Sequence, residues 1–215
     1  MYSAVVVAGG SGLRSGLPYN KVLHEIHQKP VLMYSVECFL RDQDCGEVIV
    51  VASSEDKEKI LEIVPSSVKV VEGGETRGDS VYQGLLAATK TYVMIHDAAR
   101  PNINVTMLRA IKEAWKTEDA VTLGVTVADT IKTVKVGYVH RGVDRDEIIA
   151  VQTPQGFLRA LIIDAYDKKY PQAKYTCDAS IVQEVLNKPI KVVQGSRLNV
   201  KFTTEEDLKL LEMIL

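Results

Sequence analysis

The sequence predicts an α/β fold of three layers, in which a mostly parallel, twisted sheet is covered by helices on both faces. Short apolar runs typical of strands alternate with amphipathic runs typical of helices along the 215 residues. The first apolar run leads directly into a glycine-rich loop. One charged segment, at about 126–149, departs from this alternation and has the pattern of a projecting hairpin.

The expected strands are short runs of Val, Ile and other apolar residues. Continuous apolar runs of this kind are typical of parallel strands, because such strands are buried on both faces. The runs cover residues 5–8, 48–52, 68–71, 92–95, 120–125 and 190–193.

The expected helices lie between these strands and carry start signals. Ser53 or Ser54 can cap the second helix, and Asn104 can cap the fourth. Thr203 with Glu206 has the pattern of a capping box at the start of the last helix. The helices cover residues 30–40, 55–63, 79–89, 104–115, 157–168 and 178–186, and the last begins at 203–204.

The charged segment at about 126–149 is expected to form a β-arm. Two runs, 130–135 and 138–140, have strand patterns and are joined by a turn at Val136 and Gly137. An isolated hairpin with few large apolar residues is only marginally stable in water. We therefore expect a single domain over 1–215 whose arm projects and is stabilised by a second copy of the chain. A loose surface hairpin is the alternative.

Composition limits the classes of partner. The formal net charge is −2, so no excess of positive charge favours bulk binding to nucleic acid or to an anionic membrane. The three cysteines lack metal-ligand spacing, which indicates reduced thiols in the cytoplasm. Met1 leads directly into the first strand, and no apolar run approaches the length of a membrane span. We expect a cytoplasmic protein that holds any anionic substrate with a few placed cations.

The loop after the first strand combines glycines with cations. It runs from Ala8 to Arg14 (AGGSGLR), and Lys21 follows. Glycines lack a Cβ, so the backbone can approach a ligand closely, and successive N–H groups can form an anion site. Arg14 and Lys21 add two positive charges to the same loop. This combination suits a polyphosphate and indicates chemistry at phosphorus with a nucleoside triphosphate.

The loop has three other possible interpretations. A glycine-rich turn can simply permit tight packing. A dinucleotide-binding fingerprint requires a third Gly or Ala where Ser15 stands, and the next strand comes too late for its acidic residue. A Walker A loop requires Gly-Lys followed by Ser or Thr, which is missing.

Four further polar segments lie in loops or after expected strands. Residues 73–80 (GGETRGDS) precede a helix and can grip a base with backbone groups and the Ser80 hydroxyl. The others are 96–101 (HDAARP), 152–157 (QTPQGF) and 199–208 (NVKFTTEEDL).

Together these segments resemble the 2-C-methyl-D-erythritol 4-phosphate cytidylyltransferase family from Ala8 to Asp207. The family's patterns are a glycine-rich loop with Arg then Pro and Lys, His-Asp-Ala-Ala-Arg-Pro, Asp-Thr-Ile-Lys, Thr-Pro-Gln-x-Phe, Thr-Asp-Asp-Ala-Ser and Asn-x-Lys-x-Thr. The first loop is shared with many sugar-phosphate nucleotidyltransferases, whereas the later motifs are much more specific. This chain departs from the family before Lys21, where Tyr-Asn stands, and at Cys177, where an acid is usual. The resemblance implies a Rossmann-like nucleotidyltransferase fold.

The resemblance also implies a reaction. CTP and 2-C-methyl-D-erythritol 4-phosphate would give 4-diphosphocytidyl-2-C-methyl-D-erythritol and pyrophosphate, in isoprenoid precursor biosynthesis. The attacking phosphate is already an anion and needs no general base, so catalysis is mostly positioning and charge stabilisation. Mg²⁺, or another divalent cation, would bind mainly phosphate oxygens and water, with Asp97 as a candidate ligand.

The resemblance assigns site residues in three groups. The catalytic residues are Arg14, Lys21 and Lys201. The acceptor phosphate would contact Arg100, Thr153 and Thr176 of one subunit, and Thr130 and Arg145 from the arm of the other subunit of a homodimer. Nucleotide binding falls on Ala8, Gly9, Gly10, Gly12, Gly74, Glu75, Ser80 and Asp97.

Three alternatives remain at this point. A cytidylyltransferase for ribitol 5-phosphate or a related polyol phosphate shares almost every motif. A sugar-1-phosphate nucleotidyltransferase that uses UTP or GTP shares the first loop but lacks residues 96–101 in this form. A non-catalytic nucleotide-binding module belongs to a different class. Arg14, Lys21 and Lys201 together argue against it, because binding alone does not need a lysine at the attacking phosphate.

Overall fold

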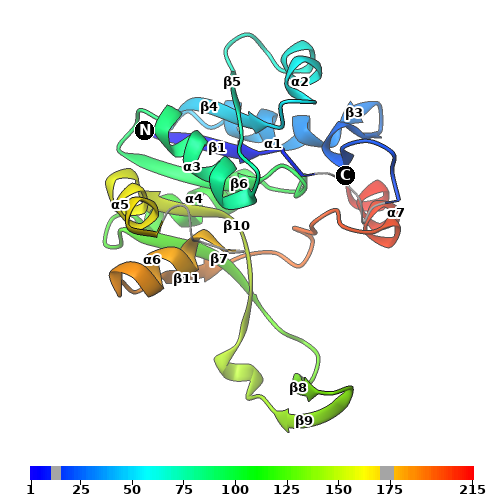
Figure 1. The fold of residues 1–215 in the computed structure, drawn as a ribbon, viewed down its shortest axis with the longest axis vertical. Coiled ribbons are helices and arrows are strands. Elements are labelled where there is room, and N and C mark those ends of the chain that lie inside the picture. The colour runs from blue at the N-terminus through cyan, green and yellow to red at the C-terminus, as the bar shows by residue number, and fades with distance from the viewer. Residues whose placement is uncertain (11–15, 170–176) are drawn as a thin grey trace.

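The computed structural model describes residues 1–10, 16–169 and 177–215. A seven-stranded sheet forms its centre (Figure 1). The strands are β1 (Tyr2–Val7), β4 (Cys45–Ala52), β5 (Lys69–Glu72), β6 (Tyr92–Asp97), β7 (Ala120–Thr126), β10 (Ile149–Leu158) and β11 (Lys191–Gln194). They lie in the order β11-β7-β10-β6-β1-β4-β5. All neighbours are parallel except that β10 is antiparallel to both β6 and β7, which confirms the mostly parallel sheet.

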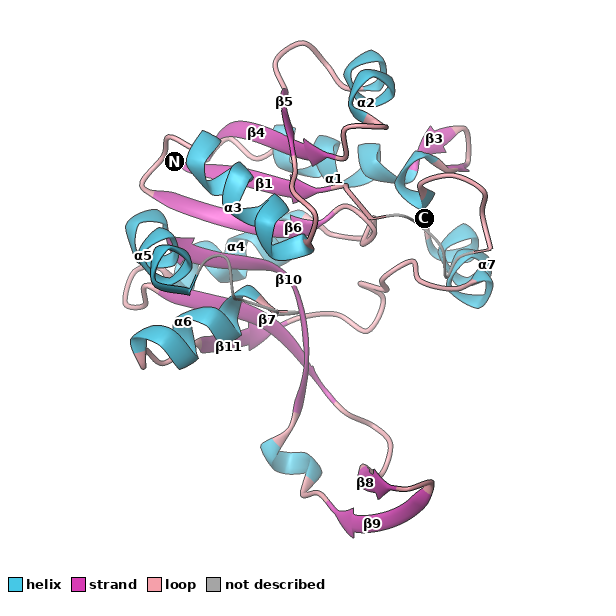
Figure 2. Ribbon diagram, viewed as in Figure 1, coloured by secondary structure: helices cyan, strands magenta, loops and turns pink. Residues whose placement is uncertain are grey.

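Helices cover both faces of the sheet (Figure 2). Successive side chains of β1 point to opposite faces, so Ala4 and Val6 join one apolar cluster and Val5 joins the other. The first cluster includes side chains of α1 (Val31–Leu40), α2 (Lys57–Ile63), α4 (Val105–Ala114) and α7 (Glu205–Ile214). The second includes side chains of α3 (Arg77–Ala87), α5 (Arg159–Lys169) and α6 (Asp178–Leu186). These two clusters give the predicted three layers. No helix in the described part of the chain has the length and apolar character needed to cross a membrane.

The helix starts were predicted with mixed success. Asn104 caps α4, since its side chain accepts hydrogen bonds from two N–H groups of the first turn. The capping box of α7 consists of Thr204 and Asp207, one residue beyond the expected pair. The cap predicted for α2 was wrong. Its N-cap is Asp56, which makes no side-chain capping bond, and Ser53 instead accepts a hydrogen bond from the N–H of Asp56.

The prediction missed β10, which is a central strand. Residues 152–157 were expected to lie in a loop or after a strand, with a helix beginning at residue 157. Pro and Gly usually interrupt strands. The pairing of β10 with β7 shifts register between Gln152 and Gln155, so Pro154 needs no partner in the ladder. Gly156 is required by close packing, because a Cβ there would meet the side chains of Ile111 and Trp115.

The β-arm has the predicted form. Strands β8 (Lys132–Lys135) and β9 (Tyr138–Gly142) pair as an antiparallel hairpin that projects away from the main sheet (Figure 1). Val136 and Gly137 both have positive φ, at 51° and 81°, as the turns of two-residue hairpins require. A 3₁₀ turn, η3 (Arg145–Glu147), leads from the arm into β10. Small elements before α1 are the 3₁₀ turn η2 (Lys21–Leu23), β2 (Glu25–Ile26) and β3 (Lys29–Pro30).

We predict that Gly84→Ala destabilises the protein although alanine is the better helix former. A Cβ at Gly84 would meet Val5 Cγ1 and lie 2.9 Å from Val51 Cγ2, between α3 and the sheet. Overpacking costs about 1–3 kcal/mol, which outweighs the roughly 1 kcal/mol of helix propensity that is gained. Denaturant unfolding should show a lower free energy of unfolding for Gly84→Ala. Gln83→Ala, at the exposed neighbouring position, should change it by less than about 0.5 kcal/mol. Equal or greater stability of Gly84→Ala contradicts the prediction.

Candidate functional site

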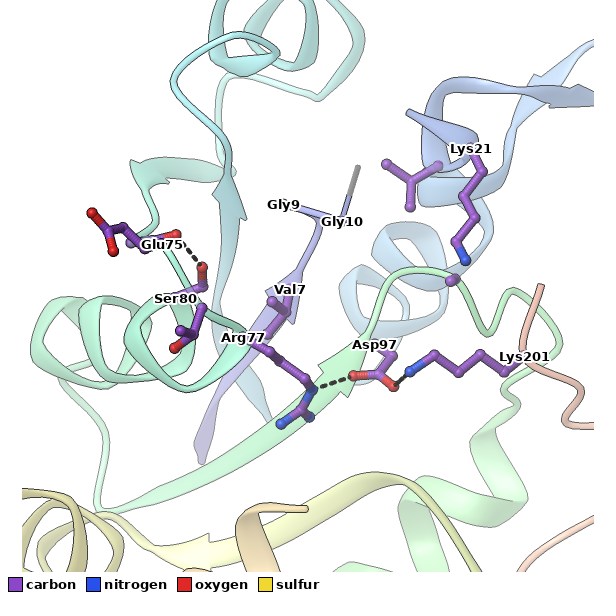
Figure 3. A pocket seen from close by; sticks show the side chains of 13 residues that line it. Val7, Gly9, Gly10, Lys21, Glu75, Arg77, Ser80, Asp97 and Lys201 are labelled. Carbon is purple, nitrogen blue, oxygen red and sulfur yellow. Dashed lines mark hydrogen bonds and ion pairs between the residues drawn. The ribbon is translucent and has the colours of Figure 1, made fainter. Parts of the chain in front are cut away.

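A cavity of about 350 Å³ lies beyond the carboxyl ends of β1 and β6 (Figure 3). In open α/β sheets this edge is where ligands bind. Five regions of the chain form its walls: the end of β1 with the first residues after it, η2, the turn before α3 with the start of that helix, the end of β6 with the residues after it, and the segment before α7. The lining residues are Val7, Gly9, Gly10, Lys21, Val22, Gly74, Glu75, Thr76, Arg77, Ser80, Asp97, Ala99 and Lys201.

Asp97 occupies the floor of this cavity between two cations. Its Oδ1 accepts a hydrogen bond from Arg77 Nε at 3.0 Å, and its Oδ2 accepts one from Lys201 Nζ at 2.6 Å (Figure 3). Burial alone would raise the pKa of Asp97, but the charges of Arg77 and Lys201 outweigh that effect and lower the pKa well below its usual range. The carboxylate is therefore ionised, and its two oxygens point in fixed directions.

A second cavity of about 200 Å³ shares a wall with the first. Arg77, Asp97 and Lys201 line both cavities. The smaller cavity adds Arg100 and Thr153, whose side chains are a cation and a hydroxyl. Its remaining lining residues are Val151, Gln152, Gln155 and Cys177. The arrangement offers two compartments that meet at an ion-paired carboxylate.

A buried network fixes the backbone at Asp97. The fully buried His96 has Nε2 within 3.1 Å of the carbonyl oxygen of Arg100, and Nδ1 within 3.1 Å of Thr153 Oγ1. A carbonyl can only accept, so Nε2 carries the proton and Nδ1 accepts from the Thr153 hydroxyl. Thr153 Oγ1 in turn accepts from the N–H of Asp97 at 3.0 Å. Burial lowers the pKa of His96 to about 3, so the ring stays neutral near pH 7.

Comparison with known proteins identifies the family. The family model for 2-C-methyl-D-erythritol 4-phosphate cytidylyltransferase matches residues 2–215. The chain belongs to this family. A protein of that name from Clostridioides difficile (strain 630) is 35% identical over 222 residues, which span all of this chain and 94% of that protein. Another, from Clostridium tetani (strain Massachusetts / E88), is 38% identical over 213 residues, which span 95% of this chain and 86% of that protein.

Solved structures agree with this membership. The 4-diphosphocytidyl-2C-methyl-D-erythritol synthase of Anaerococcus prevotii DSM 20548 matches with a TM-score of 0.86 at 29% identity, over 99% of this chain and 97% of that one. The 2-C-methyl-D-erythritol 4-phosphate cytidylyltransferase of Francisella tularensis matches with a TM-score of 0.86 at 28% identity, over 100% and 99% of the two chains. The predicted family, the nucleotidyltransferase fold and the enzyme class are thus confirmed.

The structure gathers most of the predicted site residues of this cytidylyltransferase family member at the two cavities. Arg100 and Thr153 line the smaller one. Eight predicted residues line the larger one: Gly9, Gly10, Lys21, Gly74, Glu75, Ser80, Asp97 and Lys201.

Other predicted residues lie elsewhere. Ala8 does not line either cavity, and its N–H donates to the carbonyl of Val51 while its own carbonyl accepts from Asn20. Thr130 precedes β8 and Arg145 begins η3, and neither residue lines one of the two cavities. Gly12, Arg14 and Thr176 lie outside the described residues.

Arg77 and Asp178 were not assigned a role in the site from the sequence. Asp178 is the first residue of α6, and its carboxylate accepts two hydrogen bonds from Arg77. Arg77 lies within the 73–80 segment and is the first residue of α3. A cation in the first turn of a helix opposes the helix dipole, and this was the signal that could have marked Arg77.

The residues present fit a metal ion that is bound mainly by substrate. Within the described ranges, no group of three or more His, Cys, Asp and Glu side chains is gathered for a metal. Asp97 is a carboxylate on the larger cavity, and each of its oxygens has a second lone pair besides the one that accepts from Arg77 or Lys201. One carboxylate with phosphate oxygens and water is a usual set of ligands for Mg²⁺.

We predict that His96→Gln flattens the dependence of stability on pH. The folded state keeps His96 neutral down to about pH 3, whereas the unfolded chain binds a proton near its ordinary pKa of 6.5. The unfolded state therefore binds more protons between these values, and stability falls as pH decreases through this window, by at most about 1.4 kcal/mol per pH unit. Denaturant unfolding at pH 7, 6 and 5 should show a smaller loss for His96→Gln. His140→Gln, on the exposed arm, should keep the parent slope. An unchanged slope for His96→Gln would contradict the prediction.

Proposed function

We propose that this protein joins CTP and 2-C-methyl-D-erythritol 4-phosphate, and releases 4-diphosphocytidyl-2-C-methyl-D-erythritol and pyrophosphate in isoprenoid precursor biosynthesis. Family membership over residues 2–215 supports the reaction. The observation that carries the proposal is the pair of cavities that share Arg77, Asp97 and Lys201. Two compartments that meet at an ammonium group suit two substrates whose phosphates must be brought together.

CTP occupies the larger cavity in this proposal. The glycine-rich backbone at Gly9 and Gly10 offers N–H groups to the triphosphate, with Gly12 and Arg14 further along the same loop. The turn at Gly74 and Glu75 binds the base together with Ser80. A Cβ on Gly74 would meet Asp79 Cβ, so this close turn depends on glycine.

The acceptor phosphate occupies the smaller cavity, at Arg100 and Thr153, with Thr176 as a further contact. This phosphate attacks the α-phosphorus of CTP, an O–P bond forms, and the bond to pyrophosphate breaks. Lys201 lies on both cavities and neutralises charge on the attacking phosphate and the α-phosphate. Lys21 and Arg14 neutralise the triphosphate and the leaving pyrophosphate.

A bound Mg²⁺ belongs to the same proposal. Asp97 would hold it together with phosphate oxygens, and Asp97 is also suited to the ribose hydroxyls. When bound, the ion would supply positive charge to the phosphates. Removal of divalent cations should therefore weaken turnover.

The active form is proposed to be a homodimer through the β-arm. Val136, Tyr138 and Val139 are apolar or aromatic and strongly exposed on the arm, which favours cover by another surface. Arg145 lies at the base of the arm, and its Nη1 donates to the carbonyl of Ala128 at 3.2 Å. In the dimer Thr130 and Arg145 would reach the acceptor phosphate of the partner subunit. A cytoplasmic location is part of the proposal, because the free thiols of Cys38, Cys45 and Cys177 are typical of a reducing compartment.

Pyrophosphate release tests the proposed reaction. With CTP and Mg²⁺ we expect release with 2-C-methyl-D-erythritol 4-phosphate, and little with ribitol 5-phosphate or glucose 1-phosphate. Lys201→Ala should lower turnover by about 100-fold or more while calorimetry still detects CTP binding, because Lys201 acts at the reacting phosphates. Release only with ribitol 5-phosphate would reassign the acceptor. CTP binding without release for any acceptor would favour a non-catalytic module.

Mixing two inactive variants tests the arm. Arg145→Ala removes the proposed contribution to the partner's site, and Lys201→Ala removes the chain's own. In a mixed dimer one site keeps both residues, so co-expression of the two variants should restore about a quarter of the sites on random pairing. A control variant, Arg159→Ala, changes an arginine that follows the end of β10 farthest from the arm. Unlike Arg145→Ala, this variant should be active on its own. No restoration in the mixture would contradict the exchange of arm residues between subunits.

A further inference from the structure

Arg77 has a side chain with three directed contacts to two carboxylates. Its Nε donates to Asp97 Oδ1 at 3.0 Å, and its Nη1 and Nη2 donate to Asp178 Oδ1 and Oδ2 at 3.0 and 2.8 Å. The guanidinium is planar and rigid, so a change in the direction of one of these bonds changes the other two. A lysine ammonium is a compact point charge and lacks this fixed planar fork.

Asp178 is itself fixed from behind. Its side chain is only 1% exposed, and Oδ1 accepts a further hydrogen bond from the Tyr166 hydroxyl at 2.8 Å. A buried carboxylate is costly unless it is paired and hydrogen-bonded, and Arg77 with Tyr166 satisfies this requirement. Neither Asp178 nor Tyr166 lines either cavity. Their side chains connect to the cavities through Arg77, which lines both.

Asp97 connects Arg77 to Lys201, the residue proposed to act at the reacting phosphates. Asp97 bonds Arg77 through one carboxylate oxygen and Lys201 through the other. The charges of Arg77 and Lys201 balance those of Asp97 and Asp178. This balance allows a carboxylate to stand in a cavity that must receive a triphosphate.

We propose that Arg77 is a positioning residue, fixed by Asp178 and Tyr166, which sets the direction of the Asp97 carboxylate and thereby the place of Lys201 Nζ. The inference rests on the proposed function, since it assigns Arg77 a part in the same transfer reaction. Direct binding of phosphate by Arg77 is a different role, and the same experiment separates the two.

The chain contains a matched control for Asp178. Asp42 accepts a hydrogen bond from the Tyr2 hydroxyl at 3.0 Å and two from Lys112 Nζ at 2.7 and 2.8 Å. Its side chain is 9% exposed, and Lys112 is 23% exposed against 24% for Arg77. Tyr2 begins β1, so this second group of tyrosine, aspartate and cation lies at the opposite edge of the sheet from the two cavities.

The experiment compares Asp178→Asn with Asp42→Asn. Both variants lose a carboxylate charge of similar setting, so both should lower the thermal stability. Only Asp178→Asn should lower kcat, by about 10-fold or more, because small errors in position are costly at the reacting atoms. The KM of Asp178→Asn for CTP should change much less than its kcat. Asp178→Glu should recover part of kcat relative to Asp178→Asn, although it should be no more stable than Asp178→Asn. Tyr166→Phe should lower kcat more than Tyr2→Phe does.

A second measurement does not depend on turnover. Acetic anhydride modifies amines, and mass spectrometry gives the rate at Lys201 relative to the exposed Lys59. Asp178→Asn should raise this ratio, because Asp97 no longer holds Lys201 in one place, and Asp42→Asn should leave it unchanged. If the parent protein releases no pyrophosphate with any acceptor, the proposed function is wrong. In that case the modification ratio at Lys201 still tests whether Asp178 and Arg77 position Lys201.

Two results would overturn the inference. One is an active parent in which Asp178→Asn and Asp42→Asn have the same kcat and the same Lys201 modification ratio. The other is a tighter affinity for CTP in Asp178→Asn with kcat unchanged, which is the result expected if Arg77 binds phosphate directly once it is released from Asp178.

Discussion

One buried carboxylate, Asp97, shared between Arg77 and Lys201, brings the rest of the site together. Burying an unpaired carboxylate at this depth would cost several kcal/mol of folding free energy. The two cations offset this cost and so allow the carboxylate to be buried there. Arg77 comes from the start of α3, and Lys201 comes from the segment before α7. Parts of the chain more than a hundred residues apart therefore meet at one side chain. The sheet supplies the fixed point, because Asp97 is the last residue of the central strand β6.

The antiparallel strand β10 is the second constraint. It lies between β6 and β7 and carries Gln152 and Thr153 to the edge where β6 ends. Because Thr153 hydrogen-bonds both His96 and the N–H of Asp97, the smaller cavity and the floor of the larger one are built on the same contacts. The adjacency of the two compartments thus follows from strand order.

The parts of the fold that were predictable are those determined by local sequence. Strand β1 is a continuous apolar run, and Asn104 is a strong N-cap, so both could be recognised without tertiary information. Strand β10 could not, because Pro154 and Gly156 are tolerated only through a register shift and close packing against Trp115.

The site residues likewise divide into those that local sequence reveals and those that depend on tertiary contacts. The glycine-rich turns and Lys201 were recognisable as motifs, and Gly9, Gly74 and Lys201 do line one cavity. The contact of Arg77 with Asp178 joins residues separated by 101 positions, and no local pattern specifies such a pairing. A residue proposed to act in the site of a neighbouring subunit, such as Arg145, cannot be placed at that site by the fold of one chain.

The continuity of β10 with the arm has a consequence for how the length of this protein can vary among relatives. The chain leaves the arm at η3 and enters β10 directly, and the first cavity residue, Val151, follows within three positions of the strand's start. A single inserted or deleted residue between η3 and Gln152 would invert the face that each following side chain presents. The segment between η3 and Gln152 should therefore keep a constant length among relatives.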